Sequence, residues 1–517
     1  MTRSILWADD EIDLLRPHVM FLEERGYHVR GVATGAEAVS EMKKGRFDIV
    51  FLDEMMPGMS GIDALLQIKE VNPTVPVVMI TKSQKEDLID EAIRKRIDDY
   101  LIKPVNPVQI LSACRRLLDK QQIRQQQVSQ DYLADFRELM SRPVDEMGWE
   151  DWIRVHARLM EWDLELARFP DAGLRESHEN MRRDANRDFG RYIETAYPRW
   201  VKGENPPPLS VDVISNWVAP HLRQNRRVLF VVMDCMRLDQ WLEVEPLLDP
   251  YFRIRRDYYI SILPTATPYA RNAIFGGLFP ADLTRIYPRF WQEAGNDERS
   301  KNRHERELLE KQIERLGIRL SSAPKYIKVY SADEGAAVRR QAGAFASLPL
   351  VALVYNTLDL LAHGRSESDL LQELAPDEVA FRSLTRSWFA HSSLFDLLKV
   401  MAGSDVTVVL TTDHGAVLGR RATKVLGDRE TSTNLRYKYG TNLGCDTRHA
   451  MHVKDPSTLR LPADSLVKNY ILAKEDYYFV YPTNYHEYER QYRDTFQHGG
   501  ISLDEMVLPV ATLTPKG

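Results

Sequence analysis

The chain has 517 residues, which at about 150 residues per domain predicts about three domains. Hydrophobic residues make up 44% of the chain, enough for several cores, and the formal net charge of −6 is unlike the basic footprint of a nonspecific DNA-binding protein. Cys114, Cys235 and Cys445 have no CxxC spacing, so the sequence indicates neither a cysteine zinc site nor a disulfide framework. The sequence has no signal-peptide pattern and no apolar run of about 20 residues, so we expect a cytoplasmic protein without a membrane segment.

Residues 1–120 alternate short apolar segments with amphipathic ones. The strand-like segments are SILWAD, HVRGVA, FDIVFLD, VPVVMIT and DDYLIKP, and a helical pattern such as KEDLIDEAIRKR follows each of them. Five strand–helix repeats predict a doubly wound parallel α/β sheet.

Residues suited to phosphoryl transfer follow these strands. Asp9 and Asp10 follow the first strand, Asp53 the third, Thr81 the fourth and Lys103 the fifth. The carboxyl ends of parallel strands meet at one edge of a sheet, where open α/β sheets form their sites. The acids suit Mg²⁺, a hard cation that prefers oxygen ligands, and Lys103 would pair with a phosphoryl group on Asp53.

Together with DEMMPGMSG at positions 53–61 and the Lys-Pro pair at 103–104, these residues resemble the CheY-like receiver family over the first 120 residues. The resemblance implies that a histidine kinase phosphorylates Asp53. It also implies that three acids hold Mg²⁺: Asp9, Asp10 and Asp53. By the same resemblance Thr81 and Tyr100 form the switch that senses phosphorylation, although Tyr100 could equally be an aromatic residue at the edge of the core.

Residues 121–204 are rich in Arg, Glu, Trp and Leu and contain no strand-like runs. They predict a bundle of packed helices, an uninterrupted helical connector between two domains. The three prolines of Asn205-Pro-Pro-Pro208 cannot continue a helix and mark the next boundary.

Residues 205–517 return to strand–helix alternation and predict a second, larger α/β domain. Its strand-like segments are RRVLFVVMD, YYISILP, IKVYS, LPLVALVYN, DVTVVLTTD and VLPVATL. Within it, residues 296–316 are densely charged, and we expect a helix that forms a solvated surface insertion.

Metal-binding side chains follow the strands of this second domain. They are Asp234, Asp359, His363, Asp413, His414 and His498. Asp359 and His363 are four residues apart and would share one helix face, although Asp359 could also cap that helix. Carboxylate and imidazole ligands without thiolates suit catalytic zinc, and also manganese. A single histidine is more often structural, but the convergence of this set on strand ends favours a two-metal site.

A threonine precedes a predicted helix in the segment PTATPYARN at 264–272. Pro268 suits the first helical position, and a helix N-terminus favours a phosphate. At a two-metal site the Thr267 hydroxyl would attack phosphorus, and water would hydrolyse the resulting phosphothreonine. Thr265 is the alternative nucleophile, and both threonines could instead be helix caps. Arg271 and Asn272 are candidate phosphate contacts, with a structural ion pair as the alternative for Arg271.

Cations and aromatic residues also gather in the segment NLRYKYG at 434–440, with Arg448, His449 and His452 downstream. Such a mixture is typical of surfaces that stack bases and hold a sugar-phosphate backbone. An ordinary polar loop is the alternative.

Residues from about 225 to 517 resemble the PglZ branch of the alkaline-phosphatase superfamily. The resemblance implies one zinc ion bound by Asp359, His363 and His498. It implies a second zinc ion bound by Asp234, Asp413, His414 and the nucleophile Thr267. Thr267 matches the position of the nucleophile in the threonine-dependent diesterases of that superfamily, and the sequence has no third-metal cluster of the monoesterase kind. We therefore expect a phosphodiesterase acting on linear or cyclic oligonucleotides.

The order of receiver, helical connector and PglZ domain resembles that of response regulators associated with type IX secretion in Bacteroidetes. The resemblance implies a PorY-like histidine kinase, a sigma factor and a secretion-motor protein as partners. The helical connector leads us to expect a homodimer promoted by Asp53 phosphorylation. The alternative is a catalytically silent, metal-stabilised scaffold that recruits these partners. The sequence shows no helix-turn-helix pattern and no basic stripe, so we expect no DNA-binding domain.

Overall fold

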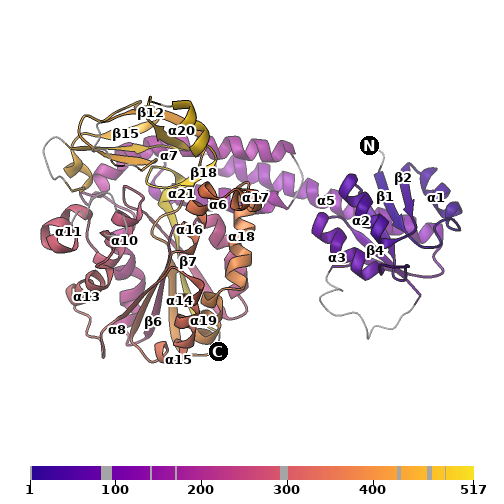
Figure 1. Cartoon of the computed structure of the whole chain (residues 1–517), viewed down its shortest axis with the longest axis horizontal. Helices are drawn as coiled ribbons and strands as arrows, with labels where there is room; N and C mark the ends of the chain where they lie inside the picture. The colour runs from indigo at the N-terminus through magenta and orange to yellow at the C-terminus, as the bar shows by residue number, and fades with distance from the viewer. Residues whose placement is uncertain are drawn as a thin grey trace. The chain divides into compact units, whose positions relative to one another are not determined.

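The computed structural model describes residues 3–82, 96–139, 143–168, 172–291, 301–427, 432, 434–462, 468–483 and 485–516. The side chains of 119–126, 172, 366, 367 and 369 are not described. The chain forms two compact units, Met1–Glu138 and Leu139–Gly517 (Figure 1). The predicted helix KEDLIDEAIRKR lies almost wholly outside the described residues.

The first unit contains a five-stranded parallel sheet with the strand order β2-β1-β3-β4-β5. Its strands are β1 (Arg3–Ala8), β2 (Tyr27–Val32), β3 (Ile49–Asp53), β4 (Val77–Thr81) and β5 (Asp99–Ile102). Its helices include α1 (Arg16–Glu23), α2 (Gly35–Lys44) and α3 (Gly61–Val71). Alternate residues of β1 enter two separate cores, Leu6 with α2 and α3 and Trp7 on the opposite face. Helices on both faces of the sheet confirm the predicted doubly wound fold.

Three long helices follow β5: α5 (Pro107–Leu139), α6 (Trp149–Ala167) and α7 (Ala172–Trp200). The helical content predicted for 121–204 is therefore confirmed, but the uninterrupted connector is wrong. Helix α5 runs through residue 120, and a short 3-10 turn, Val144–Glu146, separates it from α6. The break follows from Pro143, which cannot continue a helix. None of the described helices is both long and apolar enough to cross a bilayer.

The second unit is organised around a six-stranded sheet with the order β7-β19-β10-β6-β9-β8, in which β19 alone runs antiparallel to its neighbours. The strands are β6 (Arg227–Met233), β7 (Phe252–Ile260), β8 (Lys325–Val329), β9 (Leu350–Tyr355), β10 (Val406–Thr411) and β19 (Val507–Pro515). Every residue of β9 and β10 is buried, as expected for central strands covered on both faces. The second predicted α/β domain is confirmed.

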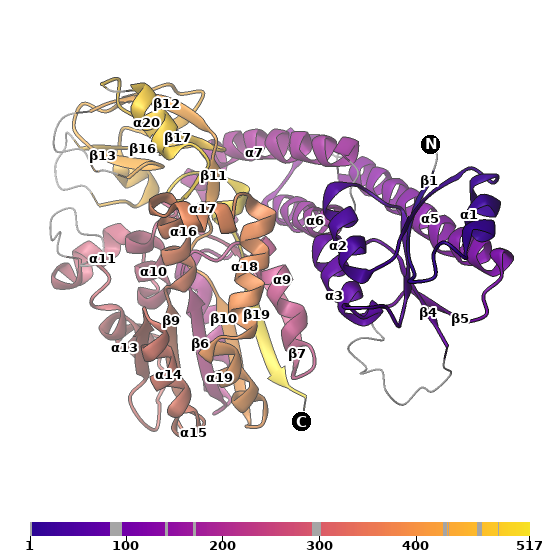
Figure 2. The same cartoon turned by 45° about the vertical axis from the view of Figure 1, so that its right-hand side comes forward.

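Helices cover this sheet on both sides (Figure 2). The described helices that follow α7 in the chain are α8 (Ala219–Arg223), α9 (Leu238–Leu248), α10 (Thr267–Gly276), α11 (Pro280–Ile286), α13 (Glu305–Arg315), α14 (Ala332–Arg340), α15 (Ala342–Phe345), α16 (Thr357–Glu367), α17 (Asp369–Leu374), α18 (Glu378–Ala390), α19 (Ser393–Ala402), α20 (Tyr485–Tyr492) and α21 (Leu503–Met506), of which α20 lies apart from this sheet (Figure 2).

Helix α13 occupies the segment that we expected to be a solvated insertion, and that expectation is wrong for its described part. Glu305 is fully buried, and Leu308, Leu309 and Ile313 pack inward at helical spacing. Because charged residues occupy the other faces of the helix, the overall composition of the segment does not reveal this apolar stripe. Helix α13 packs against α10.

Three small sheets form what we call the cap, residues 417–497. Their strands are β11 (Val417–Gly419) with β18 (Thr495–Gln497); β14 (Gly444–Cys445), β12 (Arg421–Leu426) and β17 (Tyr477–Val480); and β13 (Tyr437–Gly440), β16 (Asn469–Ala473) and β15 (Ala450–Val453). The polar-loop alternative for 434–440 is therefore wrong. Tyr437 and Lys438 are buried in β13, and the buried Arg436 pairs with Glu505 at 2.6 Å.

Buried ion pairs join α6 and α7 to the large sheet's helices. Arg182 of α7 lies 3.1 Å from Glu378 of α18, and Arg382 of α18 lies 3.0 Å from Asp239 of α9. Arg382 also pairs with Asp163 of α6. Breaking such a pair leaves an uncompensated buried charge, so the network fixes these helices in one arrangement.

The buried histidines of α6 and α7 make the second unit sensitive to acid. Burial, with a contribution from Arg182, lowers the pKa of His156 from 6.5 to about 3. Because the unfolded chain takes up this proton first, stability is retained above pH 6.5 and falls as the pH drops towards the folded pKa. We expect His156→Gln to reduce this loss by up to about 1.4 kcal/mol per pH unit, measured by chemical denaturation between pH 7.5 and about 4.5.

His486→Gln is the matched control, because the His486 side chain is 90% exposed and should leave the pH dependence unchanged. A wild-type slope in His156→Gln would show that folding does not suppress protonation of His156.

Candidate functional site

The predicted residues of the first unit lie together at the carboxyl edge of its sheet. Lys103 Nζ is 2.8 Å from Asp53 Oδ2 and 3.0 Å from Asp9 Oδ2. Carboxylate oxygens of Asp9, Asp10 and Asp53 all lie within 4.8 Å of one another. The parallel strand order produces this meeting, since β1 and β3 are neighbours and β5 lies next to β4.

The charges of this group are unbalanced. Asp9 and Asp53 are buried and Asp10 is exposed. Burial disfavours the charge of Lys103, but its hydrogen bonds to Asp53 and Asp9 outweigh burial and raise its pKa. One lysine faces three carboxylates, and a hard divalent cation with oxygen ligands would neutralise the remaining negative charge.

Thr81 and Tyr100 differ in their surroundings. The Thr81 hydroxyl donates a hydrogen bond to Glu54 at the end of β4. Tyr100 on β5 is 64% exposed, so most of its side chain lies outside the core. An exposed tyrosine on β5 is available to a partner surface.

In the second unit, Asp234, Asp413 and His414 form a fully buried cluster. Asp234 follows β6 and Asp413 follows the neighbouring β10, and one ligand atom from each of the three residues lies within 4.8 Å of the others. Gly415 completes the turn after His414, because a Cβ there would lie 1.9 Å from the Asp504 carbonyl oxygen. Any side chain at position 415 would thus prevent this turn from packing.

Two carboxylates in this buried position need a counter-charge. Burial raises the pKa of Asp234 to about 8 and that of Asp413 to about 6, although Arg271 opposes both shifts. Asp413 Oδ1 accepts backbone hydrogen bonds from Cys235 (3.3 Å) and His414 (3.0 Å). Asp413 Oδ2 is buried and accepts no hydrogen bond from any described residue. A divalent cation would hold both acids ionised, so the donor set fits a metal ion.

The His414 ring is oriented as a metal ligand is. Its Nδ1 lies 3.0 Å from the Gly415 carbonyl oxygen, which can only accept, so Nδ1 carries the proton. Nε2 is then the free acceptor and faces the cluster. A backbone carbonyl that sets the tautomer in this way is common behind metal-binding histidines.

A second cluster contains Asp359 and His363 of α16 and His498, which follows β18. His363 Nε2 and His498 Nε2 lie 3.3 Å and 3.7 Å from Asp359 Oδ1. Burial opposes ionisation of Asp359, but hydrogen bonding and charge from His363 outweigh it and lower its pKa. The predicted helical spacing of Asp359 and His363 is confirmed, and both residues face His498.

The two clusters adjoin. The rings of His414 and His498, one from each cluster, stack with centroids 4.2 Å apart. The structure therefore brings together all six predicted side chains at one edge of the sheet.

Thr267 is the first residue of α10 and faces the buried cluster. Its Oγ1 lies 3.0 Å from His414 Nε2 and 3.5 Å from Asp234 Oδ1. The Thr265 hydroxyl instead donates to the Gly500 carbonyl (2.8 Å) and accepts from the Gly499 amide (3.2 Å). Neither threonine caps the helix, because Ala266 occupies the N-cap position. Geometry thus favours Thr267 over Thr265 as the nucleophile.

The side chains of the two candidate phosphate contacts are engaged by protein groups. Arg271 is buried, and its guanidinium pairs with Asp234 and with Glu305 (2.7 Å), which is the ion-pair alternative. Asn272 Nδ2 donates to the carbonyls of Pro268 (2.9 Å) and Lys301 (3.1 Å). The expected phosphate contact from Asn272 is therefore not supported, because its amide donors hold backbone carbonyls.

Glu305 is the residue that sequence reasoning missed. It accepts hydrogen bonds from Arg271, from Asn302 Nδ2 (2.7 Å) and from Tyr326, and Lys328 Nζ lies 2.9 Å away. Burial disfavours its charge, but Arg271 outweighs burial and lowers its pKa. Glu305 thereby holds Arg271 against the buried cluster. The apolar spacing of α13 was the available signal that this face turns inward.

Comparison with known proteins identifies the parts of the chain. A family model described as the BREX system PglZ alkaline phosphatase-like domain matches residues 213–513, more than half of the chain. A response regulator receiver domain model matches residues 5–115, and a PorX response regulator linker domain model matches residues 122–201.

Individual relatives match the first unit. Chemotaxis protein CheY of Thermotoga maritima is 30% identical over 118 residues, covering 23% of this chain and 98% of CheY. Transcriptional regulatory protein ResD of Bacillus subtilis is 33% identical over 115 residues, covering 22% of this chain and 48% of ResD. The chain spans half or less of the length of several such curated relatives, from 26% to 50%.

Among solved structures, a CheY-like receiver domain protein from Methanospirillum hungatei is 26% identical, covering 24% of this chain and 99% of that one with a TM-score of 0.22. The three family models account for both units and for the helices between the two sheets. The chain is a two-component response regulator with a receiver domain and a PorX linker, and it belongs to the PglZ family of alkaline phosphatase-like domains.

Proposed function

We propose that the PglZ domain is a zinc-dependent phosphodiesterase that cleaves linear or cyclic oligonucleotides, in a regulator of type IX secretion that is phosphorylated on Asp53. The observation that carries the proposal is the position of the Thr267 hydroxyl, 3.0 Å from His414 Nε2 beside two adjoining ligand clusters. A scaffold stabilised by metal has no need for a hydroxyl in this position.

Asp359, His363 and His498 would hold one zinc ion, and Asp234, Asp413 and His414 with Thr267 would hold the other. These ions would lower the pKa of the Thr267 hydroxyl and neutralise charge on the phosphoryl oxygens. Thr267 Oγ1 attacks phosphorus, and the leaving alcohol takes up the proton that the hydroxyl gives up. The amide N–H groups at the start of α10 bind the phosphoryl group.

Water then attacks the phosphothreonine, releasing a phosphomonoester and restoring the Thr267 hydroxyl. Because the Gly415 carbonyl holds the proton of His414 on Nδ1, the Nε2 lone pair is available to the zinc ion that would also hold the Thr267 oxygen. In the first unit, Asp9, Asp10 and Asp53 would hold Mg²⁺ for transfer of a phosphoryl group from a histidine kinase to Asp53.

The nucleophile is tested by Thr267→Val, which keeps the shape of the side chain and removes the hydroxyl. We expect cleavage of bis(p-nitrophenyl) phosphate and of linear and cyclic dinucleotides by the zinc-loaded chain to fall by at least about 10³-fold. Thr267→Ser should retain measurable activity. Thr265→Ser is the matched control, because serine preserves both buried hydrogen bonds of that hydroxyl.

Cleavage that survives in Thr267→Val and disappears in Thr265→Val would transfer the role to Thr265. A metal-replete wild-type chain that cleaves none of these diesters would favour the scaffold alternative.

Zinc binding is tested by counting ions. We expect the wild-type chain to retain two zinc ions after gel filtration, measured by plasma mass spectrometry, and His363→Ala to retain one. His391→Ala, an exposed histidine outside both clusters, is the control. Because Asp234 and Asp413 must lose protons with pKa values of about 8 and about 6, zinc affinity should rise from pH 6 to pH 8. If His363→Ala kept both zinc ions, the site formed by Asp359, His363 and His498 would be contradicted.

Regulation is the remaining part of the proposal. Phosphorylation of Asp53 would shift the receiver surface that carries Thr81 and Tyr100 towards a state that dimerises, and a population shift of this kind requires contacts that only the phosphorylated state makes. The match to a PorX linker supports a PorY-like histidine kinase, a sigma factor and a secretion-motor protein as partners.

Sedimentation with and without beryllofluoride, which mimics the phosphoryl group on Asp53, tests this step. We expect the mimic to lower the dimer dissociation constant by at least about tenfold in wild type and to have no effect in Asp53→Asn. Asp13→Asn, an exposed acid outside the cluster, should behave as wild type. One oligomeric state under all conditions would exclude phosphorylation-driven dimerisation.

A further inference from the structure

Helix α7 and the cap enclose a groove of about 650 Å³ that the proposed hydrolysis does not use. Figures 1 and 2 show α7 running alongside the cap. The groove is lined by three carboxylates and by six lysine or arginine side chains: Arg183, Arg187, Arg191, Arg421, Arg448 and Lys474. This excess of positive charge is notable in a chain whose formal net charge is −6.

Helix α7 supplies half of these cations in one row. Arg183, Arg187 and Arg191 are spaced by four residues and therefore share a face, where like charges repel. Two of them pair with aspartates of the same helix: Arg187 contacts Asp184 at 2.7 Å and Asp188 at 3.4 Å, and Arg191 contacts Asp188 at 3.3 Å while its side chain is 70% exposed. Arg183 contacts Asn180. Such a row facing further cations across a groove suits an anion with several charges.

The cap supplies the opposing cations and holds them in place. Arg421 pairs with Glu475 at 2.7 Å, Lys474 with Glu194 of α7 at 3.0 Å, and Arg448 with Asp446 at 2.7 Å. Arg448 is nevertheless 82% exposed at its side chain. Because a guanidinium has five N–H donors, these pairs orient the arginines and leave donors for a ligand.

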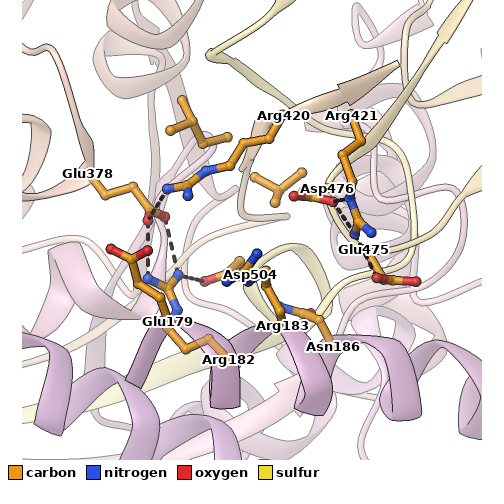
Figure 3. Close-up of a pocket in the computed structure, with 12 residues that line it drawn as sticks. Glu179, Arg182, Arg183, Asn186, Glu378, Arg420, Arg421, Glu475, Asp476 and Asp504 are labelled. Atoms are coloured by element: carbon orange, nitrogen blue, oxygen red, sulfur yellow. Dashed lines mark hydrogen bonds and ion pairs between the residues drawn. The ribbon is translucent and has the colours of Figure 1, made fainter. Parts of the chain in front are cut away.

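The neighbouring pocket, shown in Figure 3, has nearly equal numbers of positive and negative side chains. It encloses only about 60 Å³ and is lined by four arginines and five carboxylates, and Arg182 there pairs with both Glu378 and Asp504. Arg183, Arg421 and Glu475 line this pocket and the groove alike. The excess of positive side chains is therefore found in the groove and not in this neighbouring pocket.

A second pocket of about 600 Å³ adjoins the groove at His449, and its lining includes apolar and aromatic surface from Leu426, Pro482 and Tyr485. Leu426 is 61% exposed there. The His449 ring stacks on Tyr477 with centroids 4.1 Å apart, and the Arg421 guanidinium carbon lies 4.0 Å from the centroid of the same ring. His449 lines both pockets, and Tyr477 and Arg421 line the groove, so this stack holds in place the side chain that the two pockets share.

We infer that the two pockets together bind a short single-stranded oligonucleotide, at a site separate from the metal clusters. Its phosphates lie among the arginines of α7 and the cap, and a base lies against Leu426 and Tyr485. Paired cationic and aromatic surfaces are the usual means of binding single strands without reading their sequence. The groove also borders the segment that carries His498, because the Glu475 amide donates to the Ile501 carbonyl at 2.9 Å.

Fluorescence anisotropy with labelled tetrathymidylate tests the site, using the zinc-loaded full chain with Thr267→Val so that the probe stays intact. We expect the double variant Arg191→Glu and Arg448→Glu to weaken binding at least about tenfold and to reduce the salt dependence by roughly two charges. The matched control is Arg285→Glu with Arg306→Glu, which changes charge equally at side chains that are 73% and 60% exposed outside the groove. Equal thermal midpoints of the two double variants confirm that both fold.

The base pocket is tested by Leu426→Ser, which should weaken tetrathymidylate binding severalfold and leave binding of inorganic polyphosphate of equal charge unchanged. The inference is overturned if the arginine double variant binds the oligonucleotide as the control does, or if polyphosphate binds as tightly as the oligonucleotide. Since the readout is binding, a chain that binds through the groove but cleaves no diester would overturn the proposed hydrolysis alone.

Discussion

Two carboxylates buried side by side at the ends of β6 and β10 set the conditions for the rest of the second unit. Asp234 and Asp413 cannot both stay ionised in apolar surroundings without a nearby positive charge, and burial accordingly raises their pKa values. Arg271 supplies one such charge, and Glu305 in turn holds Arg271 in place. A helix that looks like surface in the sequence is therefore drawn into the interior, and the remaining demand for charge is what a divalent cation would satisfy.

The linker helices belong energetically to the second unit. Asp163 of α6 and Arg182 of α7 enter the same buried network as Asp239, Glu378 and Arg382, and Arg182 also pairs with Asp504 beside the Gly415 turn. Because removing one member strands its partner in the interior, α6, α7 and the turn that positions His414 share one packing arrangement. Any signal that reaches these helices therefore acts on residues connected to the proposed catalytic site.

The residues at strand ends could be predicted from the sequence, but the contacts that individual side chains make could not. Parallel strands place their carboxyl ends on one edge, so Asp53, Asp234 and Asp413 could be assigned to sites from their positions alone. Asn272 lies one residue after Arg271 in a motif, but its amide donors hold the Pro268 and Lys301 carbonyls. A polar loop was one of the two alternatives for segment 434–440, because β13 is formed by pairing with β16, some thirty residues away, and local pattern does not reveal such pairing.

The sequence by itself determined the order of domains, the two sheets and the residues at their edges, because strand periodicity and terminal motifs are local properties of the chain. Tertiary structure alone gave Thr265 and Thr267 different surroundings, since only the folded chain places the Gly499–Gly500 loop on one hydroxyl and His414 on the other. It also decided that Glu305 is buried and that arginines from α7 and the cap line one groove. These facts depend on contacts between segments far apart in the chain, which are settled by burial and charge rather than by local pattern.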